Sequence, residues 1–362
     1  MRVLVAMSGG VDSSVAAACL IREGYEVVGA YMKNWINEDN ITGDCPWQQD
    51  IKDARAVADF LGIDFHVVNM MKEYQSRVVD YLLQGYQDGV TPNPDVMCNR
   101  EMKFGVFLDY ALEQGFDAVA TGHYARSRVN DDGTKDILCG IDPNKNQTYF
   151  LALLNQKQVS KAMFPIGHLL KNDLRSLASD MGLPNAGKKD SQGICFIGEI
   201  KMSDFLRNYV PDNPGDIVNL NGEILGQHRG LHLYTLGQRK GIGIPSNVYK
   251  EAFVVVGKNM KKNELVVGFD SLDTPSLYAS RCLINGLSFI NKVIPENDTI
   301  LAQPRYRTPA VSAKLDLSNK GDGKAELVFD VPQRALTPGQ ICALYSGEVL
   351  LGGGVFESID YS

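Results

Sequence analysis

The sequence predicts a parallel α/β sheet, followed by a small central domain and an all-β C-terminal barrel. Strand-like and helix-like segments alternate over the first third of the chain, which is typical of a parallel sheet with helices on both faces. From Pro211 onward, Gly, Asn and Pro recur between short β-branched runs, and turn signals such as Asn221-Gly222 separate them. A chain of 362 residues has room for two or three such domains.

The elements of the first part follow from hydrophobic pattern and end signals. Val3–Met7 is a short apolar run that predicts a buried strand, and Ser13–Glu23 has helical spacing closed by the C-cap signal Gly24. Further strands are expected at Glu26–Met32, Phe65–Asn69 and Phe116–Thr121, and helices at Gln48–Leu61, Met71–Tyr86 and Met102–Gln114. The loops Ser8–Ser13 and Thr121–His123 both follow strands, so both should face the crevice at the carboxyl edge of the sheet.

The later part divides by texture. Residues 155–209 are expected to be mostly helical, and strands are expected at Asp216–Leu220, Ala252–Gly257, Glu264–Phe269, Leu301–Arg307, Ala325–Val331 and Ile341–Tyr345. We therefore predict a first domain with a helical extension over residues 1–205, a small β-rich domain over 206–272, and a barrel over 273–362.

Composition excludes several classes of protein. No apolar run approaches the roughly 20 residues of a membrane span, and the start of the chain lacks the apolar run and cleavage site of a signal peptide. We therefore expect a cytoplasmic protein without a membrane partner. The seven cysteines are scattered without a Cys-x-x-Cys pair, which disfavours a disulfide framework or a zinc ribbon. The net charge of −7 disfavours nucleic acid, but residues 301–340 hold six cations against four acids, so a local basic face for RNA stays open.

The first chemical motif is the loop between the first strand and the first helix, Ser8-Gly9-Gly10-Val11-Asp12-Ser13. Its glycines let the backbone approach a ligand, and hydroxyls with N–H groups at a helix N-terminus bind phosphate. Asp12 would repel phosphates, so it is interpreted as a Mg²⁺ ligand or a helix cap. The loop has no lysine and is not a Walker loop. The alternative is a capped strand–helix turn without a ligand.

Two cysteines have unusual settings. Cys98 follows a loop stiffened by Pro92 and Pro94, at or just before an expected helix start, where the helix dipole and Arg100 or Lys103 would lower its pKa. Asp95, three residues earlier, is placed to move a proton. Cys195 lies in the run Lys188-Lys189-Asp190-Ser191-Gln192-Gly193-Ile194-Cys195. Cationic neighbours and a glycine two residues before it are features expected of a mobile reactive thiol. The alternative is that both are ordinary half-buried cysteines.

The loop Ser8–Ser13 resembles the pyrophosphate loop of N-type ATP pyrophosphatases, which adenylate an oxygen and release pyrophosphate. With the two cysteine loops, the chain resembles the tRNA-specific 2-thiouridylases from end to end. The matching stretches are Ser8–Ser13, Asn93–Lys103, Thr121–Tyr124, Lys145–Phe150, Lys188–Phe196, Thr235–Gly243, Arg305–Arg307 and Thr337–Gln340. The resemblance implies an adenine nucleotide alpha-hydrolase-like sheet, a small central domain and a C-terminal barrel.

The resemblance also implies roles for individual residues. ATP contacts are expected at Ala6, Met7, Ser8, Gly9, Gly10, Val11, Asp12, Ser13, Met32 and Gly122. Asn93, Pro94 and Asp95 would meet the target base, Cys195 would carry a persulfide, and Cys98 would close the reaction. tRNA contacts are expected at His123, Lys145, Asn146, Gln147, Tyr306, Arg307 and Gln340. Tyr306 between Arg305 and Arg307 is interpreted as a stacking aromatic between two phosphate-binding arginines.

The implied reaction uses ATP with Mg²⁺ to adenylate the C2 oxygen of a wobble uridine, releasing pyrophosphate. The Cys195 persulfide then supplies sulfur to C2, either directly while Cys98 attacks the inner sulfur, or after Cys98 liberates sulfide. Both routes expel AMP and leave a Cys98–Cys195 disulfide, which a reductant must reopen. Asp95 is the candidate acid or base. A sulfur-relay protein or a cysteine desulfurase is the expected persulfide donor.

Three other functions remain open from the sequence. Another ATP pyrophosphatase, such as an amidotransferase or argininosuccinate synthetase, would share the loop but has no use for two such thiols. A tRNA thiolase could bind an iron–sulfur cluster through Cys98, Cys195 and a third ligand, although Asp95 occupies the place of the cysteine that would supply it. A non-catalytic RNA-binding protein with a relic nucleotide site is the third alternative.

Overall fold

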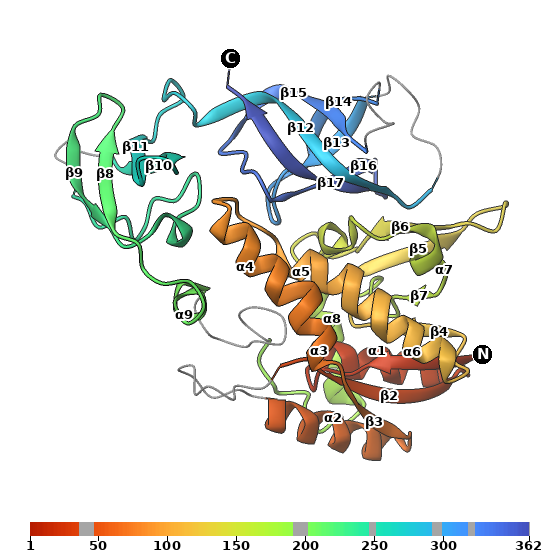
Figure 1. The fold of residues 1–362 in the computed structure, drawn as a ribbon. Helices are drawn as coiled ribbons and strands as arrows, with labels where there is room; N and C mark the ends of the chain where they lie inside the picture. The colour runs from red at the N-terminus through yellow and green to blue at the C-terminus, as the bar shows by residue number, and fades with distance from the viewer. Residues whose placement is uncertain (36–46, 191–201, 246–250, 292–298, 318–322, 362) are drawn as a thin grey trace.

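The computed structural model describes residues 1–35, 47–190, 202–245, 251–291, 299–317 and 323–361. A five-stranded sheet forms the base of the molecule, with the order β3-β2-β1-β4-β7 (Figure 1). Its strands are β1 (Arg2–Ala6), β2 (Glu26–Lys33), β3 (Phe65–Asn69), β4 (Ala118–Ala120) and β7 (Ala162–Met163). Every pairing in it is parallel, which confirms the predicted fold class of the first domain.

Helices cover both faces of this sheet, as predicted. One face packs against α1 (Val11–Arg22), α2 (Trp47–Leu61) and α8 (Lys171–Asp180). The other face packs against a continuous helical run of α3 (Met71–Tyr74), π-helix η1 (Gln75–Val79) and α4 (Asp80–Gln87), and against a second run of α5 (Pro94–Met97), π-helix η2 (Cys98–Val106) and α6 (Phe107–Glu113). Buried apolar side chains on the two faces form two separate core clusters.

The small middle domain has a four-stranded sheet in the order β10-β11-β8-β9. Its strands are β8 (Gly215–Asn219), β9 (Ile224–His228), β10 (Phe253–Asn259) and β11 (Glu264–Phe269). The 3-10 helix η4 (Leu231–Leu233) follows β9, and α9 (Met202–Arg207) precedes the domain. Three of the four strands were expected within a few residues, because each is a β-branched run between turn signals; β9 was not.

The C-terminal domain is an antiparallel barrel. Six strands run in the order β12-β15-β14-β13-β16-β17, and pairing of β12 with β17 closes the ring. They are β12 (Tyr278–Phe289), β13 (Thr299–Gln303), β14 (Val311–Asp316), β15 (Ala325–Arg334), β16 (Ile341–Ser346) and β17 (Val349–Asp360). The strand expected over Leu301–Arg307 ends at Gln303, since Arg307 adopts a left-handed backbone with φ 66°.

A hairpin of the first domain joins this barrel. Strands β5 (Ala125–Val129) and β6 (Lys135–Cys139) pair with each other, and β6 pairs with β17. Figure 1 shows the hairpin between the first sheet and the barrel. The short helices η3 (Thr148–Leu151) and α7 (Gln156–Ser160) follow it. The sequence did not predict the hairpin, whose barrel partner lies more than 200 positions away in the chain.

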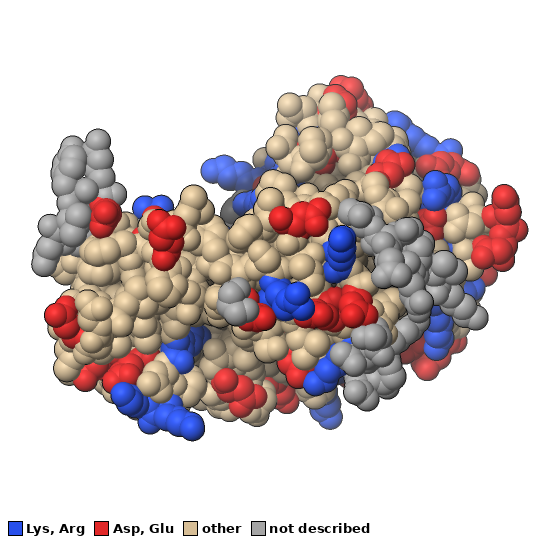
Figure 2. Space-filling view, turned by 90° about the horizontal axis from the view of Figure 1, so that it is seen from above, with Lys and Arg blue, Asp and Glu red and all other residues tan. Residues whose placement is uncertain are grey.

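Surface charge is mixed. On the face that Figure 2 shows, Lys and Arg side chains are interspersed with Asp and Glu. Arg281 pairs with Glu326 and Lys324 pairs with Glu357 on the barrel. Within the ranges that the structure describes, no helix has the length and apolar character needed to cross a bilayer.

The turn between β15 and β16 attaches the barrel to the first domain. Thr91 donates its backbone N–H to the Pro338 carbonyl at 2.9 Å, and the Gln340 amide donates to the Thr91 carbonyl at 2.8 Å. Gly339 has φ 88°, and a Cβ there would lie 3.0 Å from the Thr91 backbone. Only glycine fits both this conformation and this close approach.

We therefore expect Gly339→Ala to destabilise the protein more than Gly347→Ala does. Both glycines have positive φ, but a Cβ at Gly347 meets open space. Left-handed strain alone should lower the free energy of unfolding by about 1 kcal/mol at Gly347, and the added clash should bring the loss at Gly339 to roughly 2 kcal/mol or more. Denaturant unfolding of the two variants measures the difference; equal losses would contradict the contact.

Candidate functional site

The loop Ser8–Ser13 has the compact geometry of an anion site. The N-cap of α1 is Gly10, which makes no side-chain capping bond. The Ser13 hydroxyl accepts from the Ser8 N–H at 3.2 Å and donates to the Gly10 carbonyl at 3.1 Å. Gly9 has φ 75°, and a Cβ there would lie 2.5 Å from the Asp50 carbonyl. The backbone is therefore folded tightly at the N-terminus of a 12-residue helix, where N–H groups favour phosphate.

Two further segments of the chain contact this loop and the start of α1. Asn185 donates its amide to the Gly9 carbonyl at 2.9 Å and to the Ser14 hydroxyl at 3.0 Å. Gly122, a predicted ATP contact that follows β4, lies so close that a Cβ would be 2.7 Å from the Ser13 nitrogen. The loops after β1 and β4 thus meet at the carboxyl edge of the sheet, as the strand order predicts.

Asp12 is not a helix cap, which corrects one of the two interpretations made from the sequence. It lies in the first turn of α1, and its Oδ1 accepts from the Lys171 ammonium at 2.7 Å and from the Tyr124 hydroxyl at 3.0 Å. Burial and the nearby Asp12 carboxylate raise the pKa of Tyr124. Tyr124 is therefore a hydrogen-bond donor to Asp12 at neutral pH.

The helix that carries Cys98 begins one turn earlier than expected. Asn93 is the N-cap of α5 and accepts from the Val96 N–H at 3.1 Å, and Pro94 is the first helical residue. Cys98 begins the π-helix η2 and is 1% exposed. It is therefore not at a helix N-terminus, where the dipole would act on it most strongly. Asp95 is half-buried one turn earlier.

Cys98 belongs to the same core cluster as two of the expected nucleotide contacts, Ala6 and Met32, on one face of the first sheet. Met7 and Val11 belong to the cluster on the other face. The wide turns of η2 leave carbonyls of Arg100 and Phe104 that accept from the Gln158 amide of α7, each at 2.9 Å. This side chain stabilises the π-helix, a form that occurs often at functional sites.

The segment before Asn93 is held from two other domains. The barrel bonds both the N–H and the carbonyl of Thr91, through Pro338 and Gln340. The middle domain contributes Lys258, whose ammonium donates to the Gly89 carbonyl at 3.1 Å. Gln340, expected to contact tRNA, thus also forms a hydrogen bond between the barrel and the first domain.

The residues expected at tRNA near the hairpin are partly used inside the protein. The Asn146 side-chain oxygen accepts from the Gly140 N–H at 3.2 Å and from the Thr148 hydroxyl at 3.0 Å. Gln147 exchanges bonds with the backbone of Tyr124. Lys145 pairs with Asp190 at 2.8 Å and keeps about a third of its side chain exposed. Of these three, Lys145 is best placed to meet a phosphate.

His123, expected to contact tRNA, is largely buried, and the expected contact stays a prediction. It is 8% exposed, between Phe104 and Phe164, and its Nδ1 is 2.7 Å from the Thr121 hydroxyl. Burial, with the Lys103 charge, holds the pKa of His123 well below its ordinary value. A buried neutral imidazole is not a phosphate-binding cation.

The structure gives Arg305 a different role from the one interpreted from the sequence, and the roles of Tyr306 and Arg307 stay predictions. Arg305 is a structural arginine, since its guanidinium donates to carbonyls of Leu236 and Ala335 and to the Thr337 hydroxyl. It is not free to bind phosphate. Tyr306 stacks near Phe150 with ring centroids 4.3 Å apart, and the exposed Arg307 lies 5.4 Å from the Tyr306 ring centroid.

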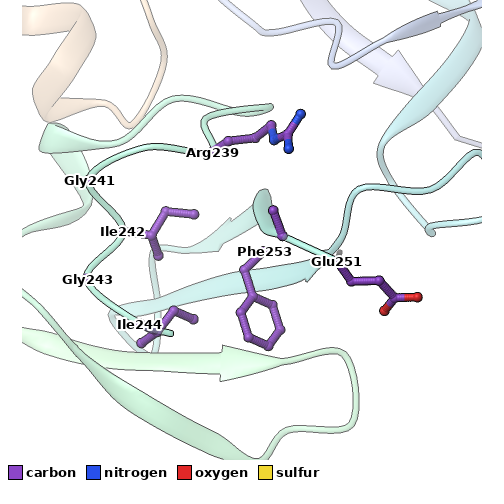
Figure 3. A pocket seen from close by; sticks show the side chains of 8 residues that line it. Arg239, Gly241, Ile242, Gly243, Ile244, Glu251 and Phe253 are labelled. Atoms are coloured by element: carbon purple, nitrogen blue, oxygen red, sulfur yellow. The ribbon is translucent and has the colours of Figure 1, made fainter. Parts of the chain in front are cut away.

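Cys195 lies outside the described residues. A surface pocket, shown in Figure 3, lies in the middle domain and is lined by Arg239, Gly241, Ile242, Gly243, Ile244, Glu251, Ala252 and Phe253. Arg239 at its edge pairs with Asp270 at 3.2 Å. None of the expected site residues lines this pocket.

Models of three domain families match successive parts of the chain. The tRNA methyl transferase HUP domain matches residues 1–199, the tRNA methyl transferase PRC-barrel domain matches 203–269, and the aminomethyltransferase beta-barrel domain matches 279–356. The chain is 57% identical over 359 residues to tRNA-specific 2-thiouridylase MnmA of Akkermansia muciniphila, covering 99% of both chains. The chain belongs to the tRNA-specific 2-thiouridylase family.

A second 2-thiouridylase MnmA, from Pseudomonas putida, is 46% identical over 362 residues, covering 99% of this chain and 95% of the relative. Among solved structures, a 4-thiouridine synthetase–RNA complex with bound ATP has a TM-score of 0.35 and 17% identity, covering 55% of this chain and 45% of that chain. That likeness is too low to carry an argument, so the family assignment rests on the sequence matches, and it confirms the resemblance found in the motifs.

Several residues of this 2-thiouridylase-family site had no signal in the sequence. Lys171 begins α8 within an ordinary amphipathic pattern, yet it contacts the pyrophosphate loop. Lys258 lies on a strand and Gln158 on a short helix, and both bond the segment that bears Asp95 and Cys98. Their roles depend on contacts across 50 to 170 positions of the chain, which local patterns do not encode.

The buried Lys258 is expected to make the free energy of unfolding of the protein depend on pH. Burial lowers the pKa of Lys258 from 10.5 to about 8. The unfolded chain keeps this proton up to the ordinary pKa while the folded chain releases it, so stability rises as the pH increases from about 8 to 10.5 and is lost as the pH falls back through 8.

We expect Lys258→Met to remove this rise, as measured by denaturant midpoints at several pH values across the window. The exposed Lys261→Met, in the turn after the same strand, is the control and should keep the wild-type slope. An unchanged slope in Lys258→Met would show that another group titrates.

Proposed function

We propose that this protein transfers sulfur to the C2 position of a tRNA wobble uridine after ATP has activated the C2 oxygen. The observation that carries the proposal is the match to 2-thiouridylases along 99% of the chain. It is supported by the packing of Cys98 with Ala6 and Met32 on one sheet face. A thiol and a nucleotide loop at one edge suit a reaction that activates an oxygen and then replaces it with sulfur.

The residues of the first loop fit the binding of ATP phosphates. Backbone N–H groups at the start of α1 and the hydroxyl of Ser8 provide neutral donors. Mg²⁺ usually reaches such sites with the nucleotide, held by one or two carboxylates and by phosphate oxygens. Asp12 provides one carboxylate at the loop, which fits this pattern. When bound, the ion would neutralise phosphate charge.

The sulfur step is proposed to use two thiols. The uridine C2 oxygen, once adenylated, leaves as AMP when sulfur from the Cys195 persulfide bonds to C2. The Cys98 thiolate attacks the Sγ atom of Cys195, which is the inner sulfur of the persulfide, and forms a disulfide with it. This attack occurs either during the transfer to C2 or in a preceding step that frees sulfide. One persulfide bond is broken and one disulfide bond formed, so an external reductant must return both thiols. Asp95 is the proposed proton carrier.

The tRNA is proposed to contact the hairpin region and the barrel. Lys145 and Arg307 supply partly exposed cations, and Tyr306 supplies an aromatic ring beside Phe150. Phosphate contacts position an RNA, and the target base must leave its stack to reach the sheet edge. Asn93, Pro94 and Asp95 are half-buried and are proposed to meet that base. A sulfur-relay protein or cysteine desulfurase would load Cys195.

The first test is the product pattern. The full chain is incubated with ATP, Mg²⁺, a persulfide source and tRNA, and the tRNA is digested for mass spectrometry. We expect 2-thiouridine, with AMP and pyrophosphate formed in equal amounts, because the loop lacks a Walker lysine and resembles pyrophosphatases. Formation of ADP and orthophosphate would exclude the adenylation chemistry.

A second test follows the thiols through one turnover without reductant. We expect thiol mapping to find a Cys98–Cys195 disulfide that accumulates with 2-thiouridine. Cys195→Ser should abolish thiolation while sparing adenylation, and Cys98→Ser should load a persulfide but stall before product.

Cys19→Ala, a half-buried cysteine on α1, serves as the matched control and should support full turnover. If thiouridine forms without this disulfide, the two-cysteine route is wrong. A brown protein with cluster absorbance would then favour the iron–sulfur alternative.

A further inference from the structure

The pyrophosphate loop presents a charge problem. The six residues Ser8–Ser13 contain no lysine or arginine, and their one ionisable side chain is the acid Asp12. Backbone N–H groups provide partial charge only. Negative charge that collects on departing pyrophosphate is stabilised most effectively by a fixed cation in a site that excludes water. The rest of the chain must supply such a cation.

Lys171 occupies the right position. It is the first residue of α8, where its own N–H donates to Asp142 at 2.9 Å. Its side chain is 11% exposed and the ammonium lies 2.7 Å from Asp12 Oδ1 and 2.8 Å from Asp190 Oδ1. The ammonium also lies 5.7 Å from the ring centroid of Tyr124. The chain therefore buries a cation directly against the loop, which is costly unless the charge is used or paired.

Three cations share the two carboxylates with which Lys171 pairs. Asp190 accepts from Lys171, from Arg175 at 2.6 Å and from Lys145 at 2.8 Å. Burial opposes ionisation of Asp190, but the bonds from Lys145 and Lys171 outweigh it and lower its pKa. The other carboxylate, Asp12, pairs with Lys171, while the nearby Asp142 accepts from the Lys171 backbone N–H. Arg175 and Lys145 can hold Asp190 while Lys171 turns to a new anion.

Lys188 is the other cation near the loop, and its bonding differs. Its ammonium lies 2.8 Å from Asp50 and 2.6 Å from Asp53. Burial disfavours its charge, but bonds to Asp50 and Asp53 outweigh this and raise its pKa. One cation shared by two carboxylates has no charge to spare. The position of the Lys188 charge is therefore explained by the ion pairs that attach its segment to α2. The position of the Lys171 charge is not explained by a structural role alone.

We propose that Lys171 is the cation that binds the β- and γ-phosphates of ATP and stabilises the departing pyrophosphate. This assignment rests on the proposed function in one respect, cleavage between the α- and β-phosphates. Lys171 replaces its bond to Asp12 with bonds to phosphate oxygens, and Asp12 becomes available to the ion that accompanies ATP. Asp190, with Arg175 and Lys145, keeps its place.

The test compares inorganic pyrophosphate with AMP as ligands of the full chain, by titration calorimetry with Mg²⁺ and without tRNA. We expect Lys171→Met to weaken pyrophosphate binding at least about tenfold, as the loss of charged hydrogen bonds does, and to leave AMP binding within about twofold. Lys171→Arg, which keeps the charge, should retain most of the pyrophosphate affinity.

Arg175→Met is the matched control. It removes a cation from the same Asp190 carboxylate, but its side chain bonds Asp190 and the Lys188 carbonyl and not Asp12. Because Lys145 still pairs with Asp190, this variant should keep pyrophosphate binding within about twofold of wild type. A similar loss of pyrophosphate binding in Arg175→Met, or equal weakening of AMP and pyrophosphate in Lys171→Met, would overturn the assignment and make Lys171 a structural bridge.

The proposed role of Lys171 and the proposed 2-thiolation function can be refuted independently of each other. The calorimetry contains no tRNA and no sulfur source, so absence of 2-thiouridine in the product test does not alter its result. If Lys171→Met fails to fold, Lys171→Gln, which also removes the charge, takes its place. A loss of pyrophosphate binding of at least about tenfold with intact AMP binding supports the phosphate contact, and a parallel loss of AMP binding, or no loss at all, refutes it.

Discussion

The segment from Gly89 to Asn93 is the constraint on which the arrangement of the three domains depends. The barrel bonds both polar groups of the Thr91 backbone, and the middle domain bonds the Gly89 carbonyl through Lys258. The next residues are the cap and first turn of the helix that carries Cys98. Any displacement of the barrel or of the middle domain therefore acts on the backbone that leads into Asp95 and Cys98.

The ionic cluster around Lys171 likewise connects segments that are far apart in the sequence. It joins the first turn of α1, the start of α8, the segment at Lys145 and the chain up to Asp190. Isolated surface ion pairs contribute little to stability, but these charges are partly buried and share partners. Removing one therefore affects the others, which is why the proposed role of Lys171 needs a control within the same cluster.

The sequence predicted those parts that local patterns determine. The strands and helices over residues 2–87 have apolar periods and end signals, and they were found within a few residues of their expected bounds. The helix expected at Met102–Gln114 begins at Pro94, and residues 155–209, expected to be mostly helical, contain only the helices α7, α8 and α9 in their described parts. The hairpin β5–β6 was missed because its barrel partner is β17, far along the chain. The surroundings of His123 and Arg305 were not foreseen, since residue type does not report burial: Phe104 and Phe164 enclose one, and the carbonyls of Leu236 and Ala335 and the Thr337 hydroxyl accept from the other.

The π-helix that begins at Cys98 shows why the sequence could single out this thiol but not its environment. Pro92 and Pro94 indicated a stiff loop before a helix expected to start at or just after Cys98, whereas the helix starts at Pro94 with Asn93 as its cap. The switch to a wider helix depends instead on Gln158, which takes two carbonyls that a regular α-helix would use internally. Gly105 permits it, since a Cβ there would lie 2.9 Å from the Arg100 carbonyl. Cys98 is consequently held in the buried core against the first sheet.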